Sequence, residues 1–383
     1  MQLTTFLYTG GYRRDPFDPL LWSGIANRVF RELERRGRLR RAVGVSLSRP
    51  RTLTLLLRYP HWSRKVVSAR LQTAVPYREA LNAEVARELR ADESSGPCLQ
   101  IGAMFNVARA LGGRERCFSY HDGCLAEQLQ SPLPPPPLPA REVDKALDFE
   151  GEVYRSMDRV FTFSRYLRDA IIKHHGVDEG RVAVLGAGIN LDDLPEPAPD
   201  KRYDSKEILF IGVDFDRKGG RHLLRAFRAV RDKHPRAVLH LVGPRQLDLP
   251  PELSGNVQYH GFLSKRVARD AGLLQELFDR SCLFVMPSLY EPFGIAPLEA
   301  MANGVPALVS DAWALRELVE PGVTGERVEV GSEDDLAEKI TALLSSPEQL
   351  KEMGERGRRE VLAKYRWEGV VDRLLAFVDS KAS

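Results

Sequence analysis

The stretch from Cys282 to Gly304 constrains the fold more than any other part of the sequence. It opens with the apolar run Cys282–Val285, which predicts a buried strand of a parallel sheet. A loop rich in Pro and Gly follows, and a helix is expected from about Ile295, because the Pro at position 297 is tolerated in a first helical turn. Gly304 is a plausible stop for that helix. A strand, a loop and a helix in this order predict an α/β fold in which a helix N-terminus is presented to an anion.

Two carboxylates, Glu291 and Glu299, flank this loop with seven residues between them. Taken alone they have an ordinary explanation, since acidic residues are common in the first turns of helices and strand–loop–helix units occur throughout α/β proteins. A phosphate or sugar site is the alternative interpretation.

The exact residues favour the second interpretation. Glu291-Pro292-Phe293-Gly294, followed by Pro297-Leu298-Glu299-Ala300-Met301-Ala302, resembles the signature of retaining glycosyltransferase family 4, which has the GT-B fold. The resemblance implies two Rossmann-like domains whose parallel sheets face an interdomain cleft. It also implies that Glu291 contacts the donor sugar, and that the amides after Gly294 hold the sugar and its diphosphate. Glu299 would bind the ribose hydroxyls. The implied donor and nucleotide site comprises Gly212, Gly243, Phe262, Leu263, Phe293, Gly294, Ile295, Ala296 and Glu299.

A second motif, Gly212–Gly220, is a Gly-containing loop after an expected strand at Glu207–Ile211. A basic pair in such a loop can neutralise a diphosphate and the charge that grows on it as a sugar leaves. The family resembled usually has Arg directly after the first Gly, but Val213 stands there. Lys218 keeps its place, and Arg217 is the nearest substitute for the missing Arg. Both are therefore candidate catalytic residues, with a plain surface turn as the alternative.

The first part of the chain opens with an expected strand at Leu3–Tyr8 and a helix at Ile25–Arg36. The resemblance implies an acceptor or donor phosphate near Gly10, Gly11 and Gly24, although a plain turn also explains the paired glycines.

A further expected strand, Cys117–Tyr120, runs into His121. A side chain at the carboxyl end of such a strand lies at the ligand edge of an open sheet. The family commonly has a His there, so His121 is a candidate catalytic residue that would contact the sugar from the opposite domain; a structural histidine is the alternative.

The polar, Pro-containing segment Leu191–Ser205 predicts a linker. We therefore expect a first domain at residues 1–195, which binds the acceptor, and a nucleotide-sugar domain at residues 196–366. The resemblance implies that a last helix, at about residues 367–383, crosses back to the first domain.

Strands are also expected at Ala42–Leu47 and Thr52–Leu57, and an extended loop at Ser131–Pro139. Trp313 replaces part of a small Gly-rich turn of the family.

Composition and cysteine spacing indicate where in the cell the protein is expected to work. No apolar run approaches the roughly 20 residues that span a bilayer, and the N-terminus lacks the basic start of a signal peptide. The four cysteines show no C-x-x-C spacing, which favours free thiols in a cytoplasmic protein. Cys117 and Cys124 with His121 lack a fourth ligand, so no metal is expected.

The net charge of +3 is unevenly spread. Residues 1–80 hold 16 Lys or Arg against 5 Asp or Glu, and much of this excess lies in Arg28–Arg51. A solvated helix face explains such a run, and so does peripheral association with an anionic membrane.

The resemblance implies an enzyme of the hexosyltransferase class. It would move a sugar from a nucleoside diphosphate sugar, with UDP or GDP favoured, to a hydroxyl with retention at the anomeric carbon. The acceptor is expected to be a lipid-linked or polysaccharide precursor at the membrane surface. No cofactor, metal or nucleic acid is expected. The alternatives are another GT-B activity (a nucleotide-sugar epimerase or an α-glucan synthase), or a non-catalytic membrane- or nucleic-acid-binding protein on a transferase scaffold.

Overall fold

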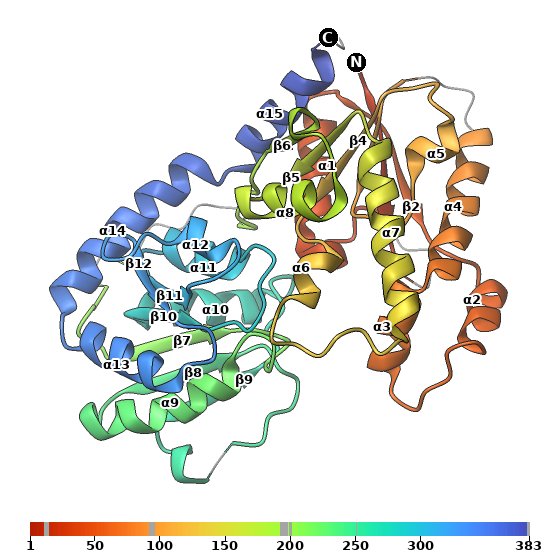
Figure 1. Cartoon of the computed structure of the whole chain (residues 1–383). Coiled ribbons are helices and arrows are strands. Elements are labelled where there is room, and N and C mark those ends of the chain that lie inside the picture. The colour runs from red at the N-terminus through yellow and green to blue at the C-terminus, as the bar shows by residue number, and fades with distance from the viewer. Residues whose placement is uncertain (11–14, 92–95, 192–197, 199–200, 250, 381–383) are drawn as a thin grey trace. The chain divides into compact units, whose positions relative to one another are not determined.

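The computed structural model describes residues 1–10, 15–91, 96–191, 198, 201–249 and 251–380, which form two compact units (Figure 1). Unit 1 comprises Met1–Gly188 with Trp367–Ser383, and unit 2 comprises Ile189–Arg366. The domain boundary expected at residues 195 and 196 falls within 192–197, outside the described residues.

Unit 1 is built on a six-stranded, wholly parallel sheet in the order β2-β1-β3-β4-β5-β6. Its strands are β1 (Leu3–Tyr8), β2 (Leu39–Val45), β3 (Cys98–Ile101), β4 (Cys117–His121), β5 (Arg159–Thr162) and β6 (Val182–Val184). Its helices are α1 (Ile25–Arg35), α2 (Arg49–Leu56), α3 (Arg64–Thr73), α4 (Val75–Arg90), α5 (Val107–Leu111), α6 (Leu125–Leu129), α7 (Ala140–Ser156), α8 (Arg165–His175) and α15 (Trp367–Asp379). Two short 3₁₀ turns, η1 (Leu21–Gly24) and η2 (Glu179–Arg181), complete it.

Unit 2 repeats the plan with the parallel order β12-β11-β10-β7-β8-β9. Its strands are β7 (Glu207–Ile211), β8 (Val238–Val242), β9 (Val257–Gly261), β10 (Leu283–Met286), β11 (Ala307–Ser310) and β12 (Gly325–Val328). Its helices are α9 (Gly220–Lys233), α10 (Ala268–Arg280), α11 (Ile295–Ala302), α12 (Leu315–Leu318), α13 (Glu333–Leu344) and α14 (Pro347–Lys364), with the 3₁₀ turn η3 (Pro251–Leu253).

The central strands of both sheets are buried on both faces, which is why they appear in the sequence as continuous apolar runs. In unit 2, β10 is buried along its whole length, and it pairs with β7 through Leu283 opposite Ile208 and Phe284 opposite Leu209. Two α/β units with parallel sheets confirm the expected fold class.

The helix α15 belongs to unit 1. It buries an apolar face against the unit: Trp367, Val370, Val371, Leu374, Leu375 and Val378. Polar contacts fix its position, because Arg36 at the end of α1 pairs with Asp372, and Arg38 Nη2 donates to Asp379 Oδ1 at 2.6 Å. Figure 1 shows this helix as the blue end of the chain, in the same unit as the red N-terminal strand.

One predicted strand is wrong. Most of Thr52–Leu57 lies in α2, an exposed helix with no buried residue, and Leu57 follows that helix as its C-cap. Its alternating Thr and Leu resemble a strand, but Pro50 in the first turn sets a helical start, and no neighbouring strand pairs with it in the described residues. The expected loop at Ser131–Pro139 is confirmed, since those residues contain neither helix nor strand.

Among the described residues, no helix is both long enough and apolar enough to cross a bilayer. All four cysteines are buried, and none of them forms a disulfide in the described part of the chain. Within the same residues there is no group of three or more His, Cys, Asp or Glu side chains arranged to hold a metal ion.

Candidate functional site

The loops of interest in unit 2 follow β7 and β10, which are neighbours at the point where the strand order reverses. From β7 the chain adds β8 and β9 on one side and later β10, β11 and β12 on the other. Open α/β sheets bind ligands outside the carboxyl ends of their strands at such a switch point. Both sequence motifs therefore lie where the topology opens a site.

At this point the structure brings together Lys218, Arg217 and Glu291. The Lys218 ammonium forms an ion pair with Glu291 Oε2, and Arg217 Nη1 lies 3.5 Å from the same oxygen. Arg217 Nη1 also donates to the Tyr290 carbonyl at 2.9 Å. Burial lowers the pKa of Lys218, while the carboxylate of Glu291 opposes that shift. Arg217 Nε also lies 3.8 Å from Asp214 Oδ2. Two cations thus lie together beside the buried Glu291 carboxylate, where their remaining N–H donors can bind an anionic ligand.

A close backbone contact locks the two loops together. Gly219, at the start of α9, has φ +77° and lies so near the other loop that a Cβ would be 1.9 Å from the Pro287 carbonyl oxygen. The Leu289 N–H donates to the Arg217 carbonyl at 2.8 Å. Only Gly fits this approach, so the basic pair is held at a fixed distance from Glu291.

The N-terminus of α11 completes this part of the site. Gly294, with φ 113°, is the residue before Ile295 and Ala296, and no side chain of the described residues caps the helix. The first N–H groups of the helix consequently remain as donors for an anion.

Glu299 in α11 is buried, and sequence reasoning missed its partner. Lys265, in the loop after β9, pairs with Glu299 Oε1, and its ammonium also lies 3.4 Å from the Asn190 carbonyl oxygen. The only available signal was that Lys265 comes three residues after Phe262, at the carboxyl end of a strand of the same sheet.

The remaining predicted donor residues lie along the same edge. Gly212 and Gly243 follow β7 and β8 and touch, because a Cβ on Gly243 would be 2.4 Å from the Gly212 carbonyl. Phe262 is 40% exposed, and the Arg245 guanidinium lies 5.3 Å from its ring centroid. Leu263 beside it is half-buried, and Phe293 is buried.

The two departures from the family pattern have different outcomes. Val213, in the place of the usual Arg, is 62% exposed. Trp313 adopts φ 50°, a left-handed conformation that favours Gly, and its ring packs edge-on against Tyr290 at 5.7 Å. The backbone thus turns as a Gly would, while an aromatic side chain lies against the residue before Glu291.

His121 lies in unit 1, at the carboxyl end of β4 as expected. Its side chain is 1% exposed and packs edge-on against Tyr154, with ring centroids 4.9 Å apart. Neither ring nitrogen has a hydrogen-bond partner in the described part of the chain. Burial, with a smaller contribution from His175, lowers the pKa of His121 to about 3. Contact with a sugar would therefore require the ring to move.

The predicted glycine site of unit 1 is described in part. Gly10 follows β1 with φ 82°, and Gly11 lies outside the described residues. Gly24 precedes α1, also with φ 82°, after Trp22 and Ser23, which both have positive φ. The Trp22 ring packs against Phe163 at 5.5 Å, which fixes this unusual turn.

Comparison with known proteins gives three further findings. Residues 196–360 match the family described as glycosyl transferases group 1. The chain is 28% identical over 249 residues to the α-maltose-1-phosphate synthase of Mycolicibacterium smegmatis, a match that covers 59% of this chain and 64% of that protein. It is 29% identical over 240 residues to the MMP α-(1→4)-mannosyltransferase of Mycolicibacterium hassiacum, covering 60% and 56%. The chain thus spans only between about half and two-thirds of the curated relatives it matches.

The fold has solved counterparts over its whole length. Sucrose-phosphate synthase from Thermosynechococcus elongatus matches with a TM-score of 0.72 at 18% identity, covering 98% of each chain. Anabaena HepE in complex with UDP matches with a TM-score of 0.66 at 16% identity, covering 100% of each. These likenesses confirm the two-domain GT-B class of fold.

Proposed function

We propose that the chain transfers a sugar from a nucleoside diphosphate sugar to a hydroxyl acceptor, because residues 196–360 match the family described as glycosyl transferases group 1. The observation that carries this proposal is the meeting of Lys218, Arg217 and Glu291 at the switch point of the second sheet, beside the open N-terminus of α11. That arrangement suits a diphosphate, which needs cations and N–H donors. UDP and GDP are the favoured nucleotides, and HepE was solved with UDP.

Each residue has a role in the proposal. Lys218, Arg217 and the first N–H groups of α11 hold the diphosphate and stabilise the charge it gains as the bond to the sugar breaks. Glu291 orients the donor sugar. Glu299 accepts hydrogen bonds from the ribose hydroxyls, with Lys265 holding its carboxylate in place. His121 contacts the sugar once its ring has moved.

The chemistry follows from these roles. The bond between the anomeric carbon and the diphosphate oxygen breaks, and the acceptor oxygen bonds to that carbon on the same face. The hydroxyl proton passes to the departing phosphate oxygen, so atoms and charge balance. We propose that the configuration at the anomeric carbon is retained and that protein cations serve without a metal or cofactor. NMR of the product anomer tests the first point, and turnover after treatment with a chelator tests the second.

Nucleotide binding tests the proposal as a whole. UDP, GDP, ADP and their sugar conjugates are compared by thermal shift, because a ligand that binds only the folded state raises its melting temperature. We expect UDP or GDP to stabilise the protein, and turnover of the matching sugar conjugate when hydroxyl acceptors are supplied. Stabilisation by none of these nucleotides would contradict the proposal.

Glu299→Ala gives the sharper test of the site. Loss of a carboxylate that binds two hydroxyls is expected to raise the Kd of the nucleotide about tenfold or more. The matched control is Glu352→Ala, which removes an exposed glutamate of α14 in the same unit. If nucleotide affinity is unchanged in Glu299→Ala, the ribose assignment is wrong.

We also propose that the protein works as a peripheral protein on an anionic cytoplasmic membrane. Two arginines of the basic segment Arg28–Arg51 already have partners, since Arg38 binds Asp379 and Arg41 binds Glu88. A better surface lies on α2 and the loop after it, where Leu53, Leu57 and Trp62 are 61%, 82% and 91% exposed. No Asp or Glu lies between residues 34 and 79. Apolar side chains in a wholly basic stretch suit an anionic bilayer interface.

Vesicle co-sedimentation tests this surface. Leu57→Ser with Trp62→Ser is expected to abolish most binding to vesicles of phosphatidylcholine and phosphatidylglycerol, while nucleotide binding stays normal. Neutral vesicles serve as the lipid control, and Val267→Ser, at an exposed apolar residue of unit 2, serves as the protein control. Equal binding by the double variant would rule out this face.

A further inference from the structure

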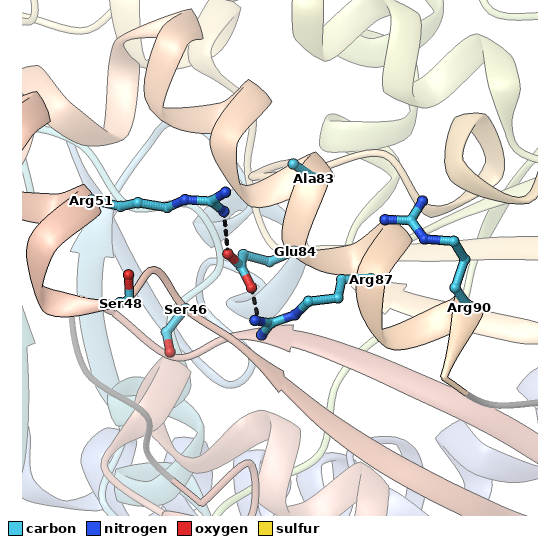
Figure 2. Close-up of a pocket in the computed structure, with 7 residues that line it drawn as sticks. All are labelled: Ser46, Ser48, Arg51, Ala83, Glu84, Arg87 and Arg90. Carbon is cyan, nitrogen blue, oxygen red and sulfur yellow. Dashed lines mark hydrogen bonds and ion pairs between the residues drawn. The ribbon is translucent and has the colours of Figure 1, made fainter.

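Unit 1 carries a cavity of about 320 Å³ that no step above uses (Figure 2). It lies between the carboxyl end of β2 and the helix α4, and its polar lining comes from Ser46, Ser48, Arg51, Glu84, Arg87 and Arg90. Ser46 and Ser48 directly follow β2, so the cavity opens at the edge where open parallel sheets bind ligands.

The charges in the cavity do not cancel. Glu84 has a side chain only 7% exposed, and it binds two arginines, Arg51 Nη1 at 2.5 Å and Arg87 Nη2 at 2.6 Å, as Figure 2 shows. Arg90 has no carboxylate partner among the described residues. Glu88 lies 3.8 Å from Arg87 Nη2, but it lines the adjoining hollow together with Arg41, which it binds at 2.6 Å. Counted over both hollows, four arginines face two glutamates, which leaves an excess of two positive charges.

Glu84 acts as a spacer between cations. Each guanidinium carries five N–H donors in a fixed plane, and a single carboxylate oxygen occupies only part of that set. By holding Arg51 and Arg87 on its two oxygens, Glu84 fixes the directions in which their remaining donors point. Arginines held in this way lose less conformational entropy when they bind an anion.

Neutral donors add to the cavity. The hydroxyl of Ser46 is buried and has no hydrogen-bond partner in the described part of the chain. Ser48 precedes α2 but its side chain does not cap the helix. An unpartnered buried hydroxyl is costly unless a ligand or water completes it. Its place beside three arginines indicates that the missing partner is an acceptor-rich anion.

We propose that this cavity binds a phosphate monoester, and that the phosphate belongs to the acceptor of the transfer. The first part stands on the cavity alone, whereas the second rests on the proposed function. A phosphate monoester has three oxygens and nearly two negative charges near pH 7, which match the two excess positive charges and the forked donors of the arginines.

There is room for the rest of such a molecule. A second hollow of about 240 Å³ shares Ser46, Glu84 and Arg87 with the first and continues along β2 from Arg41 to Val45. β2 is the edge strand of its sheet. The backbone groups of an edge strand that no other strand pairs can bond to the hydroxyls of a sugar or polyol attached to the phosphate.

Titration calorimetry with inorganic phosphate tests the binding site. Sodium chloride at matched ionic strength is the reference, because it separates a built site from screening. The variant is Arg51→Gln with Arg90→Gln, which keeps the buried Glu84–Arg87 pair intact. The matched control is Arg58→Gln, an exposed arginine after α2 that does not line the cavity.

We expect the Kd for phosphate to rise about tenfold or more in the double variant and to stay within twofold in the control. Absence of phosphate binding in the wild-type chain would overturn the inference, and so would equal binding by the double variant. Circular dichroism and the melting temperature report whether the double variant is folded; if it is not, Arg90→Gln alone carries the test, since its side chain holds no described ion pair.

Three probes distinguish where the phosphate comes from: inorganic phosphate, glycerol 3-phosphate, and phosphatidylcholine vesicles with and without phosphatidic acid. If the acceptor is a soluble phosphorylated molecule, the wild-type protein binds glycerol 3-phosphate and the double variant does not. The KM of the double variant then rises for phosphorylated acceptors only. If the phosphate belongs to a lipid, the wild-type protein binds vesicles that contain phosphatidic acid and the double variant loses that binding. If nucleotides stabilise the protein but phosphate does not bind, the phosphate site is wrong and the proposed function stands. If phosphate binds but nucleotides do not, the proposed function is wrong and the phosphate site stands.

Discussion

Lys218 is a buried cation whose charge is partly balanced by Glu291. Under the proposed function, that charge is needed most when a diphosphate leaves. Burial lowers its pKa, which means that the folded protein holds the charged form at some cost. A ligand that brings negative charge to this ammonium relieves that cost. The strongest relief comes when the leaving group carries most charge, which is the condition for lowering an activation barrier rather than only improving binding.

Lys218→Ala is therefore expected to reduce kcat by about 10²- to 10³-fold while changing donor Kd much less. Glu291 remains near Arg217, so the substitution does not leave that carboxylate without a cation. Steady-state kinetics and nucleotide titration separate the two effects. Arg221→Ala, at an exposed residue in the first turn of α9, is the control. A loss of affinity with kcat intact would mean that Lys218 serves ground-state binding only.

His121 and His175 form a pH-sensitive pair in the core of unit 1. Burial lowers their pKa values to about 3 and about 4, whereas an unfolded His titrates near 6.5. The unfolded state thus binds more protons below pH 6.5, and the free energy of unfolding falls as the pH drops towards 4. Tyr154, which stays neutral, lies between the two rings.

Each such His is expected to contribute a slope of up to about 1.4 kcal/mol per pH unit between pH 4 and 6. His121→Phe removes one titrating group while keeping a ring against Tyr154. Urea unfolding at pH 5, 6 and 7 is expected to show a shallower pH dependence in this variant, whatever its stability at pH 7. An unchanged slope would show that His121 is not held neutral.

At the scale of elements, the loops after β7 and β10 behave as one piece because Gly219 lets their backbones touch. Gly219→Ala would place a methyl 1.9 Å from the Pro287 carbonyl at a φ of +77°. We expect a loss of about 2–5 kcal/mol in the free energy of unfolding from strain and overpacking, and a weaker donor site.

The control comes from the same unit. Gly272 lies within α10 with no atom within 4 Å of a Cβ, so Gly272→Ala is expected to raise stability by about 0.5–1 kcal/mol. Denaturant unfolding measures both. Opposite signs for two Gly→Ala changes would confirm that contact, and not residue type, sets the requirement at residue 219.

The sequence predicted some helices and strands accurately and others wrongly. The buried strand expected at Glu207–Ile211 matches β7 at both ends, because parallel strands buried on two faces leave a continuous apolar run. Thr52–Leu57 was mistaken for a strand because α2 buries nothing, so its pattern of residues records no core.

The site divides in the same way. The meeting of Lys218 with Glu291 was predictable, since both follow strands of one sheet. The pair Lys265–Glu299 was not, because it depends on how α11 packs beside a loop 34 residues away. The arginine cavity appeared in the sequence only as an excess of basic charge, and the spacing of Arg51 and Arg87 on Glu84 is a property of the fold.

For the molecule as a whole, the two units are expected to lose stability separately. Leu374 on α15 is buried in unit 1, and Leu343 on α13 is buried in unit 2. Leu374→Ala should cost unit 1 about 2–4 kcal/mol and speed hydrogen exchange in β1–β6, while β7–β12 keep their protection. Leu343→Ala should do the reverse. Faster exchange throughout both sheets in either variant would mean that they unfold together.

The return of α15 to unit 1 has a consequence for synthesis on the ribosome. All residues of unit 2 are contiguous, so this unit can fold as soon as residue 366 has left the exit tunnel. Unit 1 is translated first, yet the side of α1 that packs against α15 stays uncovered until Trp367–Asp379 has been made, after the whole of unit 2. Until then the apolar surface that α15 covers is exposed. The nascent chain can therefore contain a folded unit 2 while unit 1 still lacks one of its helices. Unit 2 can thus complete its folding before unit 1, although unit 1 begins first in the sequence.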